Sequence, residues 1–340
     1  DADDIVLATG SRPLALPGNP FAGALIDSTQ ALELNTLPSS AVIIGAGAVA
    51  LEFASLWNAA GCEVTLLIRK DRVLSTWERR ASMTLTRELK RRGVNVIART
   101  AVDRVDTGAN LGATVHYRQG DSDEDRTAYG EVVLAAIGRV PNTDADWFRS
   151  SGLKLDERGY VTVDGYGRTN LDGVWALGDI TPGHALAHRA FEQGITIAEK
   201  IAGADPKPVI DDTVPQVVFS FPEAASVGLT LDQAKAREDV VEPKETAYPM
   251  LSNARMLMSG EGGSMTVVSG AFANNPDMQV VLGVHIVSPI ASDLIAEAEQ
   301  LVGNRVPLAD AARLIHPHPT FSETLGEALL KADGRPLHTR

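Results

Sequence analysis

The stretch Ala41-Val42-Ile43-Ile44-Gly45-Ala46-Gly47-Ala48-Val49-Ala50 decides the fold of this chain. Its aliphatic half predicts a buried strand, and the small and apolar residues from Ala48 to Ala60 predict a helix that follows at once. Between them, the spacing Gly45-x-Gly47-x-x-Ala50 is typical of a dinucleotide site. The first glycine permits a tight turn, the second lets the backbone approach a pyrophosphate, and the small third residue lets helix and strand pack closely. Free N–H groups at the helix start favour phosphate.

The surrounding sequence predicts an α/β fold. In the first part of the chain, the predicted strands and helices are 5–8, 41–44, 48–60, 63–68, 79–92 and 132–136. Their alternation is typical of a parallel sheet covered on both faces. After residues 205–208 the character changes, with predicted strands and helices at 217–221, 230–237, 264–269, 279–287, 290–302 and 322–331. This second pattern predicts an α+β domain with a mainly antiparallel sheet.

Composition excludes several classes of protein. A net charge of −13 argues against a nucleic-acid partner, because phosphate binding needs clustered positive charge. No apolar run reaches the roughly 18–20 residues of a membrane span, and the first residues do not form a signal peptide, so we expect a cytoplasmic protein. The single cysteine, Cys62, excludes a disulfide within the chain and a cysteine-cluster metal site. We predict no metal site and read Cys62 as a structural thiol.

The strand after the glycine motif leaves the choice of dinucleotide open. A carboxylate at its end would bind the ribose 2′-hydroxyl of NAD. Here the strand ends in Ile68-Arg69-Lys70, so Arg69 and Lys70 either face the 2′-phosphate of NADP or are solvated charges beside a site that reads the ribose through the backbone.

The octapeptide His316-Pro317-His318-Pro319-Thr320-Phe321-Ser322-Glu323 predicts acid–base chemistry. It places an imidazole, His318, five residues before a carboxylate, Glu323. An imidazole exchanges protons near neutral pH, and a carboxylate can hold its tautomer and orientation. The pair suits proton transfer to or from a thiol or hydroxyl.

Three further segments carry a family resemblance. Thr169 to Asp179 resembles the second flavin motif of the two-dinucleotide-binding flavoproteins, and residues 5–13 and 133–142 resemble their two crossover strands. The octapeptide, together with Leu186-Ala187-His188, narrows the resemblance to the dihydrolipoamide dehydrogenases, within the class I pyridine nucleotide–disulfide oxidoreductases. Phe221-Pro222-Glu223 and Ser226-Val227-Gly228 fit the interface domain of the same family.

The resemblance implies a flavoenzyme that oxidises dihydrolipoamide, or another small dithiol, and passes hydride through FAD to NAD⁺, with NADP not excluded. It implies a homodimer that can serve a 2-oxo-acid dehydrogenase complex. His318 would be the acid–base catalyst for the other subunit, and Glu323 its orienting partner. Asp179 would bind the flavin ribityl chain and Ala187 the isoalloxazine end. The residues implied to line the nicotinamide dinucleotide site are Gly45, Gly47, Ala50, Glu52, Val102 and Gly138, with Arg69 beside it.

The same resemblance implies the domain division. A partial FAD-binding domain would comprise residues 1–38 and 141–207, with a Rossmann-like NAD(P)-binding domain, 39–140, inserted in it. An α+β dimerisation domain, 208–340, would follow.

Several of these residues also have structural interpretations. Thr320-x-x-Glu323 is a capping box as well, so Glu323 can bond a backbone N–H in addition to, or in place of, His318. Glu52, one turn into its helix, can be a plain dipole-stabilising acid. We expect His316 to serve packing or to support its neighbours, and His188 to be structural.

The chain also departs from the family pattern. Family members carry a first flavin-binding Gly-x-Gly-x-x-Gly and a Cys-x4-Cys pair, and neither occurs in these 340 residues. We therefore expect a truncated form or fragment that is inactive alone. Two alternatives stay open: an NADPH-dependent reductase of low-molecular-weight disulfides, which suits Arg69 and Lys70, and a nucleotide-binding, dimerising fragment without turnover.

Overall fold

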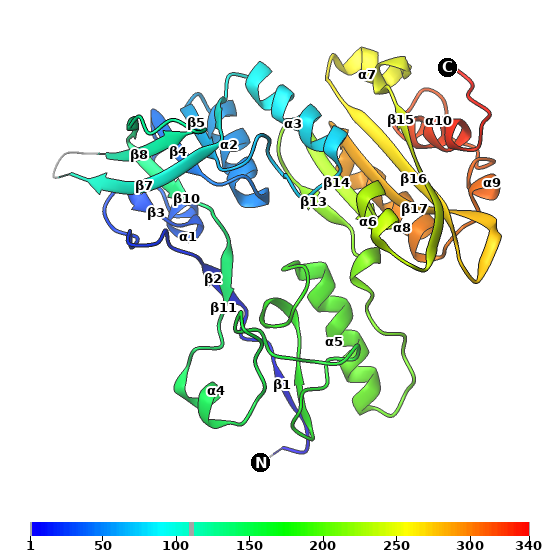
Figure 1. Cartoon of the computed structure of the whole chain (residues 1–340), viewed down its shortest axis with the longest axis horizontal. Helices are drawn as coiled ribbons and strands as arrows, with labels where there is room; N and C mark the ends of the chain where they lie inside the picture. The colour runs from blue at the N-terminus through cyan, green and yellow to red at the C-terminus, as the bar shows by residue number, and fades with distance from the viewer. Residues whose placement is uncertain (1, 109–111, 340) are drawn as a thin grey trace. The chain divides into compact units, whose positions relative to one another are not determined.

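The glycine motif follows the central strand of a five-stranded parallel sheet, at the carboxyl end of that strand (Figure 1). The computed structural model describes residues 2–108 and 112–339. The strands of this sheet, in spatial order, are β3 (Leu25–Ile26), β10 (Val132–Ala135), β4 (Ser40–Ile44), β5 (Glu63–Ile68) and β6 (Asn95–Ala98). Ile44 pairs in register with both Leu67 and Ala135, so the carboxyl ends of the three central strands are level. The glycine motif and the end of β5 therefore share one edge.

Helices cover this sheet, as the alternating pattern predicted. They are α1 (Ser28–Leu32), α2 (Ala48–Ala59) and α3 (Arg79–Arg91). A three-stranded antiparallel sheet of β7 (Thr100–Thr107), β8 (Ala113–Gln119) and β9 (Arg126–Gly130) packs beside it, because Val115 and Tyr117 share a buried cluster with Val42 and Val133.

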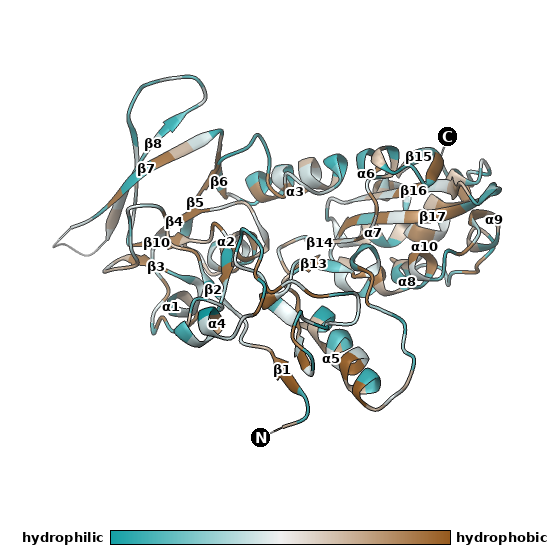
Figure 2. Cartoon of the chain, turned by 60° about the horizontal axis from the view of Figure 1, so that its bottom comes forward, coloured by the Kyte–Doolittle hydropathy of each residue, from teal (hydrophilic) through white to brown (hydrophobic). Residues whose placement is uncertain are grey.

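The C-terminal part forms a second, wholly antiparallel sheet. Its strands, in spatial order, are β13 (Gln216–Val218), β14 (Glu223–Gly228), β17 (Asn275–Ser288), β16 (Ser264–Phe272) and β15 (Val240–Tyr248). Its helical segments are α6 (Leu231–Ala236), η3 (Met250–Ser252), α7 (Ala254–Ser259), α8 (Ala291–Gly303), α9 (Leu308–Ala311) and α10 (Glu323–Ala332). Figure 2 shows the hydrophobic colouring of the central strand, β17. Alternate residues of β17 face different cores: Ile286 packs with α8 and α10, whereas Val287 packs with α3.

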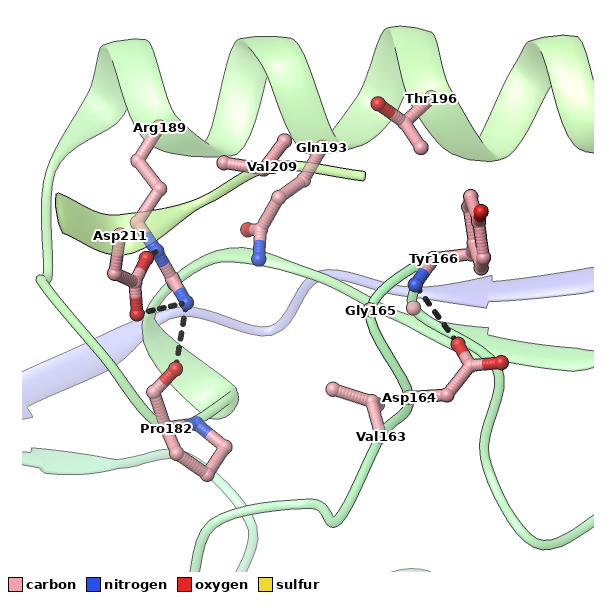
Figure 3. A pocket seen from close by; sticks show the side chains of 11 residues that line it. Val163, Asp164, Gly165, Tyr166, Pro182, Arg189, Gln193, Thr196, Val209 and Asp211 are labelled. Atoms are coloured by element: carbon pink, nitrogen blue, oxygen red, sulfur yellow. Dashed lines mark hydrogen bonds and ion pairs between the residues drawn. The ribbon is translucent and has the colours of Figure 1, made fainter. Parts of the chain in front are cut away.

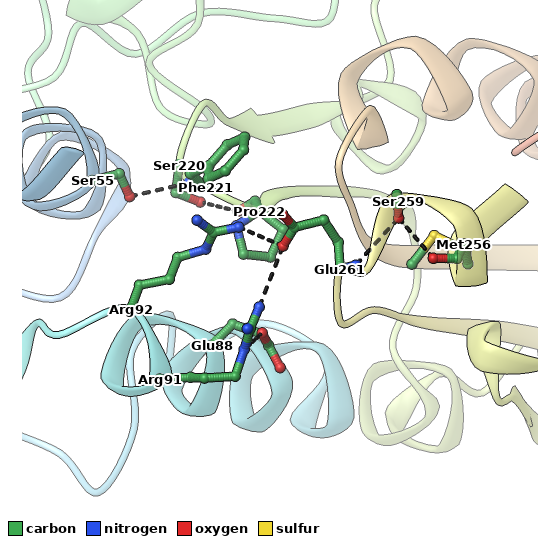
Figure 4. Close-up of polar contacts among 10 residues, drawn as sticks. All are labelled: Ser55, Glu88, Arg91, Arg92, Ser220, Phe221, Pro222, Met256, Ser259 and Glu261. Atoms are coloured by element: carbon green, nitrogen blue, oxygen red, sulfur yellow. Dashed lines mark hydrogen bonds and ion pairs between the residues drawn. The ribbon is translucent and has the colours of Figure 1, made fainter.

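The α3–β17 packing joins the nucleotide-binding sheet and the C-terminal sheet in one compact unit, Ala15–Ile137 with Pro215–Arg340. At their junction, Arg91 of α3 and Arg92, the C-cap residue of that helix, both pair with Glu261 (Figure 4). The Arg92 guanidinium also lies 4.0 Å from the centre of the Phe221 ring. On α2, Ser55 Oγ accepts the Phe221 N–H at 3.1 Å. Two helices of the nucleotide-binding part thus hold the segment between β13 and β14.

A second compact unit contains Asp1–Leu14 and Gly138–Val214. Its strands form two pairs: β1 (Ile5–Leu7) with β12 (Val174–Ala176), which is parallel, and β2 (Ser11–Pro13) with β11 (Arg139–Pro141), which is antiparallel. Its helical segments are α4 (Asp146–Ser150), η1 (Gly178–Ile180), α5 (Ala187–Ile201) and η2 (Asp211–Thr213). A small core of Phe148, Val161, Ala176 and Ile180 holds them together.

The structure differs from the sequence-based expectations at several points. Residues 15–38 were assigned to the FAD-binding domain but lie with the nucleotide-binding sheet, because β3 pairs with β10. The strand at residue 5 was expected to be buried, yet Ile5 and Val6 are exposed, since β1 pairs with β12 alone among the described strands. Strands β14 and β15 were not predicted.

Within residues 2–108 and 112–339, the helices lack the combination of length and apolar character that crossing a membrane requires. In the same part of the chain, no group of three or more His, Cys, Asp or Glu side chains is arranged to hold a metal ion.

Candidate functional site

The glycine motif has the geometry that its spacing predicted. Gly45 has a φ of +143°, and a Cβ on it would lie 2.2 Å from the Ala136 carbonyl oxygen, so no other residue fits. Gly47 caps α2 and has open space around it, since no atom lies within 4 Å of where its Cβ would be. Ala50 is fully buried against Gly45. The Gly47 cap makes no side-chain hydrogen bond, so the first N–H groups of α2 are available to a pyrophosphate.

The other residues predicted for the dinucleotide site lie on separate elements. Arg69 follows β5 at the same edge and is exposed. Val102 lies on β7 and is half-buried. Gly138 belongs to the other unit. For Arg69, both the 2′-phosphate and the solvated interpretation stay open.

Glu52 has a partner that the sequence did not suggest. Its Oε1 accepts the Phe219 N–H at 3.0 Å, so this carboxylate ties α2 to the residue that follows β13. The dipole interpretation named no partner, and the ligand interpretation stays a prediction. In the structure, Glu52 connects the helix of the glycine motif to the C-terminal sheet.

Asp179 lies in a polar cluster of the second unit. Its Oδ2 accepts a hydrogen bond from Ser11 Oγ at 2.5 Å, and Arg139 Nε donates to the same Ser11 Oγ at 2.6 Å. Arg139 Nη2 also donates to the Ser11 carbonyl at 2.7 Å. The Asp179 side chain remains about one-quarter exposed. A carboxylate accepts several hydrogen bonds, so Asp179 retains the capacity to bind the hydroxyls of a flavin ribityl chain.

Ala187 is the first residue of α5, and residues of the next turns hold this helix in place. Buried Arg189 pairs with Asp211 at 2.5 Å and donates to the Pro182 carbonyl at 2.6 Å, beside a cavity of about 270 Å³ (Figure 3). Gln193 Oε1 accepts the Gly178 N–H at 2.8 Å, which ties the helix to the turn that carries Asp179. The Leu186 cap makes no side-chain hydrogen bond, so the N–H groups of the first turn can donate to a flavin carbonyl.

His318 and Glu323 form the pair that the octapeptide predicted. His318 Nδ1 lies 2.8 Å from Glu323 Oε1, and Glu323 Oε2 accepts the Thr320 N–H at 2.8 Å. Glu323 therefore makes both of the contacts that the sequence offered as alternatives. Thr320 is not the helix cap, however, because α10 begins at Glu323 with Ser322 as its N-cap. Burial opposes ionisation of Glu323, but the Thr320 and His318 bonds outweigh it, so the pKa of Glu323 is lowered.

His316 ties this loop to α8, as expected. Its Nε2 lies 2.9 Å from Glu297 Oε1 of α8, and this hydrogen bond raises the pKa of His316 against the opposing effect of burial. Gly326 makes room for the ring, because a Cβ there would lie 2.4 Å from His316 Nδ1. His316 thus fixes the backbone two residues before His318, whose own side chain is 72% exposed.

Exposed apolar side chains lie directly before the octapeptide and in and beside α7. Ile315, directly before His316, is 97% exposed, and Leu314 is half exposed. Asn253 Nδ2 donates to the Thr320 carbonyl at 3.1 Å, which places α7 next to the loop. The exposed apolar residues in and beside α7 are Leu251, Leu257 and Met258. Such a patch is typical of a protein–protein interface.

The sequence predicted the candidate binding and acid–base residues, but not the residues whose hydrogen bonds hold those segments in place. Ser11, Arg139 and Gln193 were not singled out, because their partners are distant in the sequence. Arg189 directly follows the Leu186-Ala187-His188 triplet, so its position next to a motif was the one available signal.

Comparison with known proteins agrees with this arrangement. The family model described as pyridine nucleotide-disulphide oxidoreductase matches residues 1–194, and the model of its dimerisation domain matches residues 214–329. Dihydrolipoyl dehydrogenase from Cupriavidus necator is 36% identical over 340 residues, covering 99% of this chain and 69% of that protein. The Geobacillus stearothermophilus protein of the same name is 37% identical over 339 residues, covering 98% and 69%.

Solved structures give the same relationship. LpdA from Mycobacterium tuberculosis superposes with a TM-score of 0.85 at 29% identity, covering 97% of this chain and 70% of that one. The HOCl-induced flavoprotein disulfide reductase RclA from Escherichia coli superposes with a TM-score of 0.83 at 24% identity, covering 96% and 73%, which indicates a shared fold.

Proposed function

Because the chain belongs to the pyridine nucleotide-disulphide oxidoreductase family, we propose that it is a dihydrolipoyl dehydrogenase component, which serves the oxidation of dihydrolipoamide to lipoamide. In this reaction two thiols lose two protons and two electrons; both electrons and one proton go to NAD⁺ as hydride, and the other proton is released. FAD and the pyridine nucleotide supply this redox chemistry when bound. The residues of this chain bind, orient and move protons.

The observation that carries the proposal is the His318–Glu323 pair. Because Nδ1 faces the ionised Glu323, the neutral ring carries its proton on Nδ1 and leaves the Nε2 lone pair free. Nε2 is therefore the atom that accepts a thiol proton, and Glu323 stabilises the imidazolium that forms. The His318 side chain is largely exposed on its own subunit, which suits a group that acts on a neighbouring one.

The test is turnover of dihydrolipoamide with NAD⁺ by a protein that carries these residues together with a redox-active cysteine pair, since these 340 residues contain Cys62 alone. We expect His318→Gln to lower kcat by about 10²–10⁴-fold, the range for a general acid–base. The matched control is His116→Gln, which removes another imidazole–carboxylate pair, His116 with Asp106 at 2.8 Å, on the β7–β8–β9 sheet. Undiminished turnover in His318→Gln would exclude the acid–base role.

Dinucleotide binding can be tested on the 340-residue chain itself. NADH and NADPH are titrated separately, with Arg69→Ala beside the parent chain. If Arg69 faces a 2′-phosphate, the substitution weakens NADPH binding and leaves NADH binding unchanged. An NADPH preference that depends on Arg69 would favour the second candidate function, an NADPH-dependent reductase of small disulfides.

The dimerisation-domain match and the apolar patch around Ile315 support a homodimer. Light scattering of the chain and of Ile315→Lys tests it, and we expect the substitution to shift the mass towards the monomer.

We further propose that the protein belongs to a 2-oxo-acid dehydrogenase complex and lies in the cytoplasm. Co-purification with the acyltransferase core of such a complex, from the cytoplasmic fraction, would test both proposals.

A further inference from the structure

A cavity of about 320 Å³ lies where the last turns of α2 and α3 meet the segment between β13 and β14. Its apolar wall is formed by Leu89, Val94 and Phe221, and the first two of these are buried. An apolar cavity of about 150 Å³ is large enough to bind benzene. This cavity therefore has room for a ligand of that size that also carries a polar group.

Three polar side chains line the same cavity, and each has a donor that no acceptor in the described part of the chain uses. The Arg92 Nε is buried without a hydrogen-bond partner, although Nη2 of the same guanidinium pairs with Glu261 (Figure 4). Ser55 Oγ accepts the Phe221 N–H at 3.1 Å and keeps its own proton available. The Asn58 amide makes no hydrogen bond to a described residue. Because a buried donor without an acceptor costs free energy, a ligand that accepts from all three would be stabilised here.

The charges beside the cavity favour an anion. Three arginines of α3 and its C-cap pair with two glutamates, which leaves one positive charge in excess: Arg87, Arg91 and Arg92 against Glu88 and Glu261. The ends of α2 and α3 contribute only partial negative charge, and backbone N–H groups just after each helix already bond to carbonyls of the last turn. A guanidinium N–H with no partner is a strong donor to a carboxylate.

We propose that this cavity binds a small carboxylate with a flat apolar body, of the size of benzoate. The carboxylate accepts hydrogen bonds from Arg92, Asn58 and Ser55, and the body packs against the apolar wall. The site does not rest on the function proposed above. Asn58 is in the last turn of α2, about 15 Å along the helix from Ala48 at its start, so the cavity and the glycine motif lie at opposite ends of this helix.

Benzoate itself is the probe, and benzamide, which has nearly the same shape without the charge, is the comparison ligand. Calorimetric titration and saturation-transfer NMR follow binding to the 340-residue chain. We expect one site per chain, with a Kd for benzoate of about 1 mM or lower. Benzamide should bind about five- to tenfold more weakly, because hydrogen bonds to a charged acceptor are stronger. Saturating NADH should leave the affinity for benzoate unchanged.

Four variants locate the ligand. Asn58→Leu removes the amide at similar bulk and should weaken benzoate binding about tenfold. Arg92→Gln removes the charge and should abolish the preference for benzoate over benzamide. Ala59 lines the cavity and is exposed, so Ala59→Phe can fill it without entering the core and should block both ligands. The matched control is Asn304→Leu, which replaces an exposed asparagine at the C-cap of α8 and should bind like the parent chain.

Urea unfolding verifies that each variant is folded. Should Arg92→Gln fail to fold, Asn58→Leu and Ala59→Phe still decide the question. A parent chain that binds no benzoate would overturn the proposal, and so would benzoate binding that survives Ala59→Phe or is displaced by NADH, because the ligand would then lie elsewhere. Benzamide that binds as tightly as benzoate would overturn the assignment to a carboxylate. Turnover of dihydrolipoamide enters none of these results, so they stand or fall apart from the proposed function.

Discussion

Glu323 uses one oxygen for the His318 ring and the other for the Thr320 backbone, each at 2.8 Å. The same carboxylate therefore orients the imidazole and closes the turn that leads into α10. This double contact means that the position of the acid–base group and the local backbone depend on one ionised side chain.

The lowered pKa of Glu323 predicts a pH-dependent contribution to stability. The unfolded side chain titrates near 4.3, so the contribution is fully present above that value and is lost as the pH falls through the lower pKa of the folded state. We expect Glu323→Gln to be less stable than the parent chain at neutral pH, and the difference to shrink on acidification. Thermal melts at about pH 7 and pH 4 measure it, and a constant difference would contradict the prediction.

The two glycines of the dinucleotide motif should fail in different ways. A Cβ on Gly45 collides with the Ala136 carbonyl, so we expect Gly45→Ala to destabilise the chain by about 3 kcal/mol or more. Gly47 has an extended φ of −90° and open space, so Gly47→Val should fold. Its side chain would instead occupy the space that a pyrophosphate needs, and NADH affinity should fall at least about tenfold.

Thermal melts and NADH titrations of both variants check this difference. The matched control is Gly61→Ala, a glycine of positive φ outside the motif with no atom near its Cβ position, which should lower stability modestly and leave NADH affinity intact. Gly47→Val that binds NADH like the parent chain would argue against a pyrophosphate at this loop.

The cluster around Glu261 predicts how firmly α3 is joined to the C-terminal sheet. Arg92 pairs with Glu261 and stacks on Phe221, and its side chain is mostly buried. We expect Arg92→Ala to lower the free energy of unfolding by about 1–2 kcal/mol. Arg87, on the same helix, is largely exposed and lies 3.6 Å from Glu88, so Arg87→Ala should cost less than about 0.5 kcal/mol. Urea unfolding compares them, and equal losses would contradict a specific role for Arg92.

Local sequence patterns predicted the elements that hold the site. The strands that these patterns missed depend on contacts between residues distant in the sequence. The strand, glycine turn and helix from residue 41 to 59 obey short spacing rules, and strand 63–68 was predicted with the observed bounds. By contrast, β14 contains Ala224-Ala225-Ser226, which has weak strand propensity, and becomes a strand because it pairs with β17. β15 contains Pro243 at a register shift, so its pattern is interrupted.

The site shows the same division. His318 and Glu323 are five residues apart, so their pairing was visible in the sequence. The Glu52–Phe219 bond spans 167 residues, and no local rule could have suggested it. Ser11 reaches Asp179 across 168 residues for the same reason.

Two histidines of the C-terminal sheet domain should affect acid stability in opposite directions. His285 is fully buried between Ser226 Oγ at 2.8 Å and the Leu229 carbonyl at 3.2 Å, and burial lowers its pKa. Below about pH 6.5 the unfolded ring binds a proton that the folded one does not, so stability falls by up to about 1.4 kcal/mol per pH unit. His316 has a raised pKa, so its contribution is present below about pH 6.5 and is lost as the pH rises through its folded value.

The two substitutions should therefore change the pH profile in opposite ways. We expect His285→Gln, although less stable at neutral pH, to lose less stability between about pH 7.5 and pH 5 than the parent chain. His316→Gln should lose more over the same interval, because the stabilising Glu297 pair no longer strengthens on acidification. Urea unfolding at both pH values measures the differences. Profiles that change in the same direction would mean that burial of His285 and the carboxylate partner of His316 do not control their protonation.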